Sequence, residues 1–136
     1  VNRTYEIGLS EISIRDKCGL LAYYPLATGY LSGKYRNNQK PENSRQFLFK
    51  GWERFGNPRA LKAYDAYYEL AKSYGISIAQ LSLAFVNSRE FVTSNIIGAT
   101  NIDQLKENIS SIDIELNKEI LEKVNLIHDD YPNPAP

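Results

Sequence analysis

The chain has 136 residues, of which 43% are apolar, so it can form at most one domain with a hydrophobic core and is too apolar to be disordered. Its 16 basic and 16 acidic residues cancel, which argues against a general nucleic-acid or anionic-membrane surface. No apolar run approaches the roughly 20 residues that span a bilayer, and no signal-peptide pattern is present. The single cysteine, Cys18, excludes an internal disulfide and fits a reducing compartment, so a cytoplasmic location is expected.

The first half of the chain predicts one helix, one strand and a long loop. The sequence pattern indicates a helix from Glu6 to about Lys17, and residues 20–26 have the apolar character of a buried strand. Residues 30–57 are polar and punctuated by glycines, which predicts a loop. Loops of this length inside compact domains tend to be functional or mobile.

Capping residues predict the helices of the second half. Asn57 caps a helix that carries a proline in its first turn, and Gly75 stops this helix. Ser77 and Gln80 fit a capping box at the start of the next helix, which runs to about Ser88 and is apolar on several sides. The remaining predicted elements are a strand within residues 91–99 and two helices capped by Asn101 and Asn117.

The order of these elements defines an α/β fold class. Strands separated by helices imply a parallel sheet that is covered on both sides. Two strands cannot make such a sheet, so half of the fold is expected to be missing. The chain also contains no Met and begins at Val1, which predicts a piece of a longer protein or a processed product, with the missing part upstream.

Two loops that follow the predicted strands suit a nucleotide. In residues 23–34 a strand ends in an aromatic residue and opens into Gly, Ser and Lys, which can stack a flat ring and hold a phosphate nearby. After the second strand, Gly98 and Ala99 carry little side chain where a backbone must approach a ligand. The helix that begins at Asn101 directs its free N–H groups and positive dipole end at the same point.

Several polar side chains of these loops are candidates for cofactor contacts. Arg45 offers a planar fork that suits a phosphate, and Lys34 offers a mobile point charge. Gln104, Glu107 and Asn108 are spaced i, i+3 and i+4, and therefore share one helix face.

No catalytic or metal-binding constellation is visible. The chain has one His, one Cys and no clustered carboxylates, so no metal site is expected. No nucleophile and base are paired. His128 lies on the apolar stripe of the last helix, where a packing role is expected. The same role is expected for the tyrosines on helix faces, namely Tyr64, Tyr67, Tyr68 and Tyr74.

The chain resembles the C-terminal part of the aldo-keto reductases, in the branch that includes bacterial Tas-like reductases and potassium-channel β subunits. The resemblance covers essentially the whole chain in order. The segments that carry it are residues 22–27, 29–35, 44–45 and 97–109, together with the opening Asn2-Arg3.

The resemblance implies a (β/α)8 barrel that binds NADPH at its C-terminal face. Residues 1–136 would be the C-terminal portion of this single barrel domain, supplying strands 7 and 8 with their flanking helices and the C-terminal helix. The first half of the barrel would be missing. The substrate of the whole barrel would be a small aldehyde or ketone, which the loops in this chain do not define.

The resemblance also implies which residues hold the cofactor. Those expected along the nicotinamide, the ribose and the pyrophosphate are Tyr23, Tyr24, Pro25, Leu26 and Ala27. Those expected at the phosphates from the long loop are Lys34, Ser44 and Arg45. Those expected at the adenosine, its 2′-phosphate and the adenine are Gly98, Thr100, Gln104, Glu107 and Asn108.

Two tyrosines have distinct expectations. Tyr23 would stack on the nicotinamide ring and fix which face gives up the hydride. Tyr24 replaces the small Ser common at that position in the family, so it either narrows the pocket or points elsewhere.

The catalytic Asp, Tyr, Lys and His of the family come from the first half of the barrel, and no position here matches them. The sequence therefore predicts the NADPH-binding half of a carbonyl reductase that is catalytically incompetent as an isolated chain. The alternative is a stand-alone nucleotide-binding or protein-interaction module from a truncated or split gene. Because open barrel strands expose edges and an apolar face, such a module should dimerise or seek its missing half.

Overall fold

The computed structural model describes residues 1–49, 51 and 53–135, so the predicted loop residues Lys50 and Trp52 and the terminal Pro136 lie outside the described part. The α-helices are α1 (Leu9–Arg15), α2 (Arg45–Leu48), α3 (Pro58–Ser73), α4 (Ile78–Asn87), α5 (Ile102–Ser110) and α6 (Lys118–Asp130), and the strands are β1 (Leu20–Ala22) and β2 (Val92–Asn95). The 3₁₀ turns are η1 (Thr4–Glu6), η2 (Ala27–Ser32), η3 (Arg36–Asn38), η4 (Glu53–Gly56) and η5 (Ser111–Asp113).

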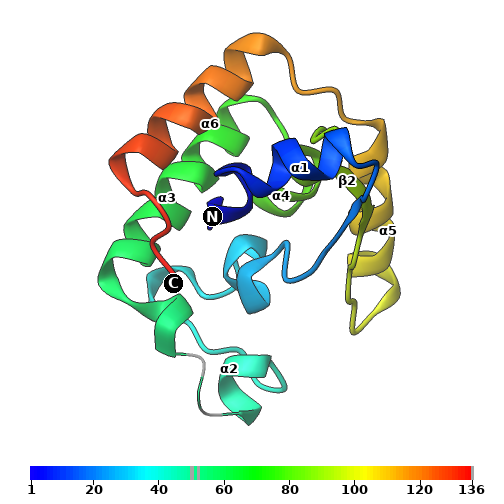
Figure 1. Ribbon diagram of the computed structural model, residues 1–136. Helices are drawn as coiled ribbons and strands as arrows, with labels where there is room; N and C mark the ends of the chain where they lie inside the picture. Colours follow the sequence, from blue (N-terminus) through cyan, green and yellow to red (C-terminus); the bar gives the residue numbers. More distant parts are fainter. Residues whose placement is uncertain (50, 52, 136) are drawn as a thin grey trace.

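The helices are arranged around α4. Figure 1 shows α3 and α6 on one side of the molecule and β2 with α5 on the other. Helix α4 contacts α3, α5 and β2, so it joins the two sides. Its side chains are accordingly enclosed, as the apolar pattern predicted, and Leu83 is the largest side chain in the described residues that is fully buried. None of the helices described in residues 1–49, 51 and 53–135 has the length and apolarity that a bilayer crossing requires.

The two strands pair in parallel, as predicted. Leu20 lies opposite Val92, and Ala22 lies opposite Asn95. The register shifts between these pairs, because Leu21 lies opposite Ser94 and Thr93 is left as the extra residue of a bulge. The predicted cover on both faces is wrong for the described residues, since Leu21 remains 59% exposed and β1 is only half-buried.

Both strands are shorter than the sequence pattern indicated. The predicted strand over residues 20–26 ends at Ala22 because Tyr24 has a left-handed φ of 55° and Pro25 has no N–H to donate. The strand predicted within residues 91–99 is confirmed only over Val92–Asn95.

The first helix and the long loop also differ from the predictions. The helix expected from Glu6 to Lys17 is split by Gly8, whose φ of 87° leaves η1 before it and α1 after it. The region expected as an irregular loop over residues 30–57 contains η3, α2 and η4. Short hydrogen-bonded turns thus satisfy backbone groups that a fully irregular loop would leave to water.

The predicted helix caps are confirmed. Asn57 Oδ1 accepts hydrogen bonds from the backbone nitrogens of Arg59 and Ala60, and α3 ends just before Gly75, which has a φ of 69°. Ser77 and Gln80 form the reciprocal capping box. The caps of α5 and α6 are Asn101 and Asn117, each through its side-chain oxygen.

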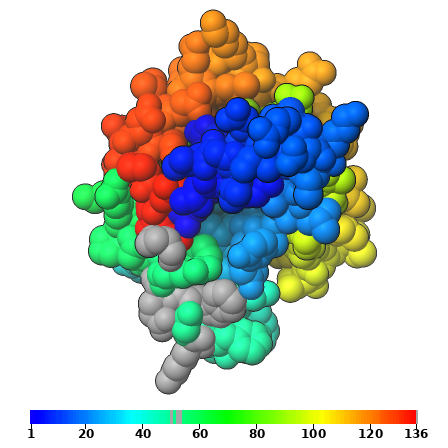
Figure 2. Space-filling view, in the orientation of Figure 1, coloured from blue at the N-terminus to red at the C-terminus, as the bar shows by residue number. Residues whose placement is uncertain are grey.

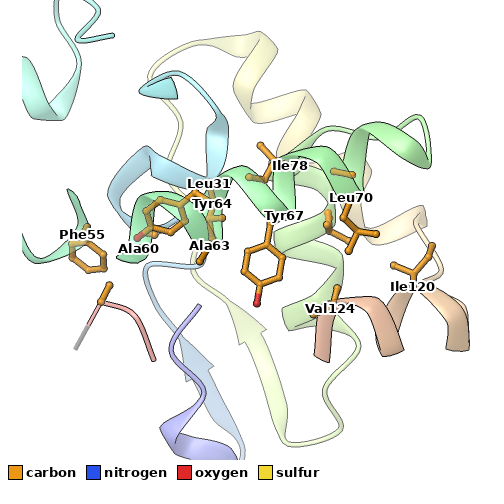
Figure 3. Close-up of a cluster of buried hydrophobic side chains, with 14 residues drawn as sticks. Leu31, Phe55, Ala60, Ala63, Tyr64, Tyr67, Leu70, Ile78, Ile120 and Val124 are labelled. Carbon is orange, nitrogen blue, oxygen red and sulfur yellow. The ribbon is translucent and has the colours of Figure 1, made fainter. Parts of the chain in front are cut away.

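The core lies where α3, α4 and α6 meet η2 (Figure 3). Tyr64 and Tyr67 of α3 are buried among Leu31, Ile78 and Val124, so their predicted packing role is confirmed. Figure 3 shows Ile120 and Val124 of α6 facing Leu70 of α3. The core stabilises the helices and leaves the outer face of the strands without cover.

We expect Gly19→Ala to destabilise the pairing of the strands. A Cβ at Gly19 would overlap with the side chain of Thr93 in the bulge, so the variant should lose about 1–3 kcal/mol of the free energy of unfolding. Urea unfolding measures this loss, and Gly98→Ala, whose Cβ meets nothing within 4 Å, is the matched control. Adding Thr93→Ala should restore part of the loss, and simple additivity of the two changes would contradict the proposed clash.

Candidate cofactor site

The two loops predicted to bind a nucleotide meet at one edge of the sheet. Ala22 and Asn95 are the last residues of neighbouring parallel strands and lie opposite each other. The backbone nitrogen of Ile96 donates to the carbonyl oxygen of Ala22 over 2.7 Å, so the pairing continues to the start of both loops. Tyr23 follows β1 directly and Gly98 follows β2 closely. Ligands of α/β folds bind at this carboxyl edge of parallel strands.

Tyr23 and Tyr24 form an aromatic pair beside β1. Their ring centroids lie 4.9 Å apart with the planes tilted by 57°. The Tyr24 ring in turn lies edge-on to Phe55, at 6.3 Å and 74°. Tyr23 is 69% exposed, so one face of its ring is open to a flat ligand, whereas Tyr24 is 42% exposed and is held between its two neighbours.

A cavity of about 450 Å³ runs along β1 and reaches this pair. Its lining includes Tyr23 and Tyr24 at one end and Phe91 and Val92 at the other. Residues 1–6 and helix α4 supply further walls. The Tyr24 ring therefore both lines this cavity and packs on Phe55.

The turn that follows Tyr24 is wound tightly. Tyr24, Ala27 and Thr28 all have left-handed φ values, between 46° and 57°. Pro25 and Leu26 are half-buried, and Ala27 is buried. The side-chain oxygen of Thr28 is buried without a hydrogen-bond partner in the described residues. Such a group is satisfied when a polar ligand or water reaches it.

Gly29 is favoured in this turn because its φ is 104°, a conformation that residues with a Cβ rarely adopt. The half-buried Lys34 side chain extends over the ring of Tyr35, with Nζ 5.2 Å from the ring centroid. Tyr35 Oη accepts a hydrogen bond of 3.3 Å from the backbone nitrogen of Gln46, the residue after Arg45. The structure thus brings the segment of Lys34 next to the segment of Arg45.

Ser44 and Arg45 begin helix α2. Ser44 is 7% exposed, and its hydroxyl has no hydrogen-bond partner in the described part of the chain. The side chain of Arg45 is exposed. Since a buried hydroxyl without a partner is costly, the Ser44 position fits a contact with an anionic oxygen of a ligand.

The start of helix α5 presents a second polar surface. The Thr100 backbone nitrogen and hydroxyl each lie 3.0 Å from Gln104 Oε1 and donate to it. Asn108 Nδ2 donates to the carbonyl oxygen of Gly98 over 3.3 Å. Gln104 and Glu107 are half-buried and Asn108 is buried, so the shared helix face predicted for them is confirmed.

The two groups of candidate residues do not form one cluster. Figure 1 shows α2 at one end of the molecule and α5 apart from it. The first turn of α5 carries an acidic side chain, Asp103, in contrast to the basic Lys34 and Arg45 of the first group. Lys34 and Arg45 therefore belong to a different region of the edge from Gln104, and a ligand that contacts both must be extended.

Sequence reasoning missed three residues of this site. Thr28 and Gln46 each bury a polar atom that has no partner among the described residues. Phe55 supports the aromatic pair across thirty residues of chain, which no local pattern indicates. The signal for Thr28 was present, because it lies within the glycine-containing turn between two candidate segments.

Burial perturbs two tyrosines of the core. Burial raises the pKa of Tyr67 to about 12, an effect that Arg3 partly opposes. Burial also raises the pKa of Tyr64 well above its usual range. Both phenols therefore stay protonated in the core at neutral pH. In residues 1–49, 51 and 53–135, no group of three or more His, Cys, Asp or Glu side chains could hold a metal ion.

Parallel strands that are joined through helices, and whose carboxyl ends open into loops at one edge, define a piece of an α/β fold. A sequence model of the Aldo/keto reductase family matches residues 6–129. The chain belongs to this family, so the resemblance seen in its motifs is confirmed.

Individual relatives support the same assignment. The chain is 42% identical over 136 residues to Protein tas of Escherichia coli K12, covering 100% of this chain and 39% of that protein. It is 32% identical over 120 residues to a probable voltage-gated potassium channel subunit beta of Oryza sativa subsp. japonica, covering 84% of this chain and 36% of the relative. The chain thus spans about two fifths of the length of these relatives.

A solved structure shows the same fold. The glycerol dehydrogenase AKR11B4 from Gluconobacter oxydans superposes with a TM-score of 0.75 and 24% identity. The match covers 99% of this chain and 41% of that one. The described helices and strands therefore form a short α/β piece with the fold of part of a larger barrel.

Proposed function

We propose that this chain is the NADPH-binding C-terminal half of an aldo-keto reductase, which in a complete barrel transfers a hydride from NADPH to an aldehyde or ketone. The observation that carries the proposal is the meeting of two phosphate-compatible loops at the carboxyl edge of β1 and β2. The hydroxyl of Ser44, which has no hydrogen-bond partner among the described residues, and the open space at Gly98 suit the cofactor.

The candidate residues would contact the cofactor in two separate regions. The open face of Tyr23 would stack on the nicotinamide, and the turn from Tyr24 to Ala27 would follow the pyrophosphate. Lys34, Ser44 and Arg45 would meet the phosphates. The residues that would hold the adenosine end are Gly98, Thr100, Gln104, Glu107 and Asn108. An extended dinucleotide can reach both regions, which a compact ligand could not.

The preference for NADPH over NADH rests on the charges and amides of this edge. Lys34 and Arg45 supply positive charge on the first loop, and Gln104 supplies an amide at the start of α5. The cofactor would supply the hydride. This chain's own residues would bind and orient it, and none of them would protonate the reduced carbonyl.

We therefore propose that the isolated chain is catalytically incompetent and acts with an upstream half of the barrel. The edge of β1 that faces away from β2 pairs with no strand in the described residues, which offers a place for a further parallel strand. The exposed and unpaired Cys18 just before β1 is compatible with the reducing cytoplasm.

The first experiment titrates the chain with NADPH and NADH while following tyrosine and Trp52 fluorescence. We expect saturable binding that is tighter for NADPH, and a weaker response to NADPH in Arg45→Ala and Gln104→Ala. Lys106→Ala is the matched control for Gln104→Ala, because Lys106 is exposed on the same helix and has no proposed contact with the cofactor. Absence of binding by a folded sample would count against a cofactor site in this half.

The second experiment adds the upstream part of Escherichia coli Protein tas as a separate polypeptide. Carbonyl reduction should appear only in the mixture, measured as oxidation of NADPH. A complex that folds as a complete barrel and still shows no turnover would contradict the proposal that this chain supplies the cofactor half.

The second candidate function is a stand-alone binding or interaction module. The observation that favours it is the set of large apolar side chains left exposed on β1, beyond β2 and on α5, namely Leu21, Ile96, Ile97, Leu105 and Ile109. A relative's name describes a potassium channel subunit, which gives an analogy for partner binding. In size-exclusion chromatography a monodisperse dimer would favour the module, and aggregation would favour an incomplete barrel.

A further inference from the structure

The C-terminal tail, residues 131–135, is fastened to the start of the chain. The side-chain amide of Asn2 bonds both ways with the backbone of Ala135: its nitrogen donates to the carbonyl oxygen, and its oxygen accepts from the Ala135 nitrogen over 3.2 Å. The backbone nitrogen of Arg3 donates to Asn133 Oδ1 over 2.7 Å. Figure 2 shows the N-terminal and C-terminal segments in contact on one face of the molecule.

The same tail is held from a second side by Asn57. The oxygen of this side chain caps α3, whereas Nδ2 donates to the carbonyl oxygens of Pro134 and Arg54, each over 2.7 Å. Pro134 is buried, and Ala135 is part of the core cluster. Asn57 therefore links three segments: the tail, the start of α3 and the turn η4.

The link to η4 leads to the aromatic pair of the candidate site. Phe55 follows Arg54, is buried, and packs edge-on against the ring of Tyr24. Tyr24 is in ring contact with Tyr23. Contacts therefore run without a break from Pro134 through Asn57, η4 and Phe55 to the two tyrosines.

We propose that Asn57 and the C-terminal tail are positioning elements for the Tyr23–Tyr24 pair, acting through Phe55. The proposal rests on the cofactor role assigned to Tyr23 under the proposed function. A backbone carbonyl held by a side-chain donor fixes η4 more closely than packing alone, because the bond has a defined direction. The orientation of Tyr23 toward a flat ring ligand would then depend on residues at the far end of the chain.

The test compares Asn57→Ser with Asn117→Ser. A serine retains the oxygen that caps the helix at either position, so both variants should keep their helix. Asn57→Ser removes the Nδ2 group that donates hydrogen bonds to the tail and to η4. Asn117→Ser leaves such links untouched, because the Asn117 side chain accepts the capping hydrogen bond from the Ile120 nitrogen. A second variant ends the chain at Asp130 and removes the tail.

The first readout needs no cofactor. With 3-fluorotyrosine in place of tyrosine, we expect Asn57→Ser and the tail deletion to shift and broaden the fluorine resonances of Tyr23 and Tyr24. The double variant should show no more than Asn57→Ser alone, since the tail acts on η4 through Asn57. Unchanged resonances in folded Asn57→Ser protein would overturn the proposal, whatever the cofactor does.

The second readout uses two ligands. Asn57→Ser should weaken NADPH binding about 5- to 10-fold, as expected for a lost hydrogen bond, and should leave 2′-phospho-ADP-ribose, which lacks the nicotinamide, unchanged. Equal weakening of both ligands would overturn a positioning role and leave a structural one. If the wild-type chain binds neither ligand, the proposed function fails. The fluorine resonances then decide alone whether Asn57 and the tail position Tyr23 and Tyr24.

Discussion

Replacing Leu83 with alanine should cost about 2–5 kcal/mol of the free energy of unfolding. Leu83 is the largest fully buried side chain in the described residues and lies on α4, which joins α3 to α5 and β2. A domain is stable by only about 5–15 kcal/mol, and this one lacks cover on its sheet. We therefore expect Leu83→Ala to be largely unfolded near 37 °C, as measured by far-UV circular dichroism and urea unfolding.

The control for this change is Leu126→Ala. Leu126 is 64% exposed on α6, so the same truncation removes little buried surface and should change stability by less than about 0.5 kcal/mol. Similar losses in the two variants would mean that α4 is not the centre of the fold in solution.

Asn108→Asp should also be strongly destabilising, by about 2–3 kcal/mol at neutral pH. Asn108 is buried, and its Nδ2 donates to the Gly98 carbonyl oxygen over 3.3 Å. A carboxylate there would lose the donor and place a buried negative charge against a carbonyl oxygen. Because Gly98 begins the proposed adenosine region, NADPH affinity should fall in the same variant.

This loss should depend on pH with a definite sign. Burial raises the pKa of the introduced carboxyl group in the folded state above its unfolded value. The protonated form regains an O–H donor for Gly98, so the variant should be less destabilised at acid pH and more so as the pH rises through the folded pKa. Urea unfolding of variant and wild type at about pH 5 and about pH 8 measures this difference.

Asn125→Asp is the matched control for the same chemical change. Asn125 Oδ1 accepts a hydrogen bond of 2.8 Å from Arg3 Nη1 at an exposed site. A carboxylate there faces a guanidinium, so its effect should stay within about 0.5 kcal/mol, without a loss that grows toward alkaline pH. A loss equal to that of Asn108→Asp would show that burial at Asn108 is not the cause.

The sequence predicted the helix starts well because caps are local. Asn57, Ser77, Asn101 and Asn117 each bond to a backbone nitrogen two or three residues ahead, so the short-range pattern contains the whole interaction. The meeting of the two loops also followed from order alone, because parallel neighbours end at the same edge.

The errors arose where distant residues decide the local conformation. The first strand stops early because Tyr24 adopts a left-handed φ and packs on Phe55, and no periodicity indicates either feature. The Thr93 side chain in the bulge lies where a Cβ of residue 19, just before the other strand, would stand, so the pair fits only with Gly19. The open face of the sheet could not be inferred from residues 20–26, whose apolar character is the same whether or not a neighbour covers them.

The contact between Leu20 and Val92 has a consequence for how the chain folds. The strands that carry the candidate site are far apart in sequence, and α3 and α4 lie between them. Helices form from neighbouring residues and are fast, whereas pairing of distant strands must first close a long loop. We expect the helices to assemble first and the carboxyl edge to form in the last step, so a nascent chain would form its candidate ligand site only after β2 has been synthesised.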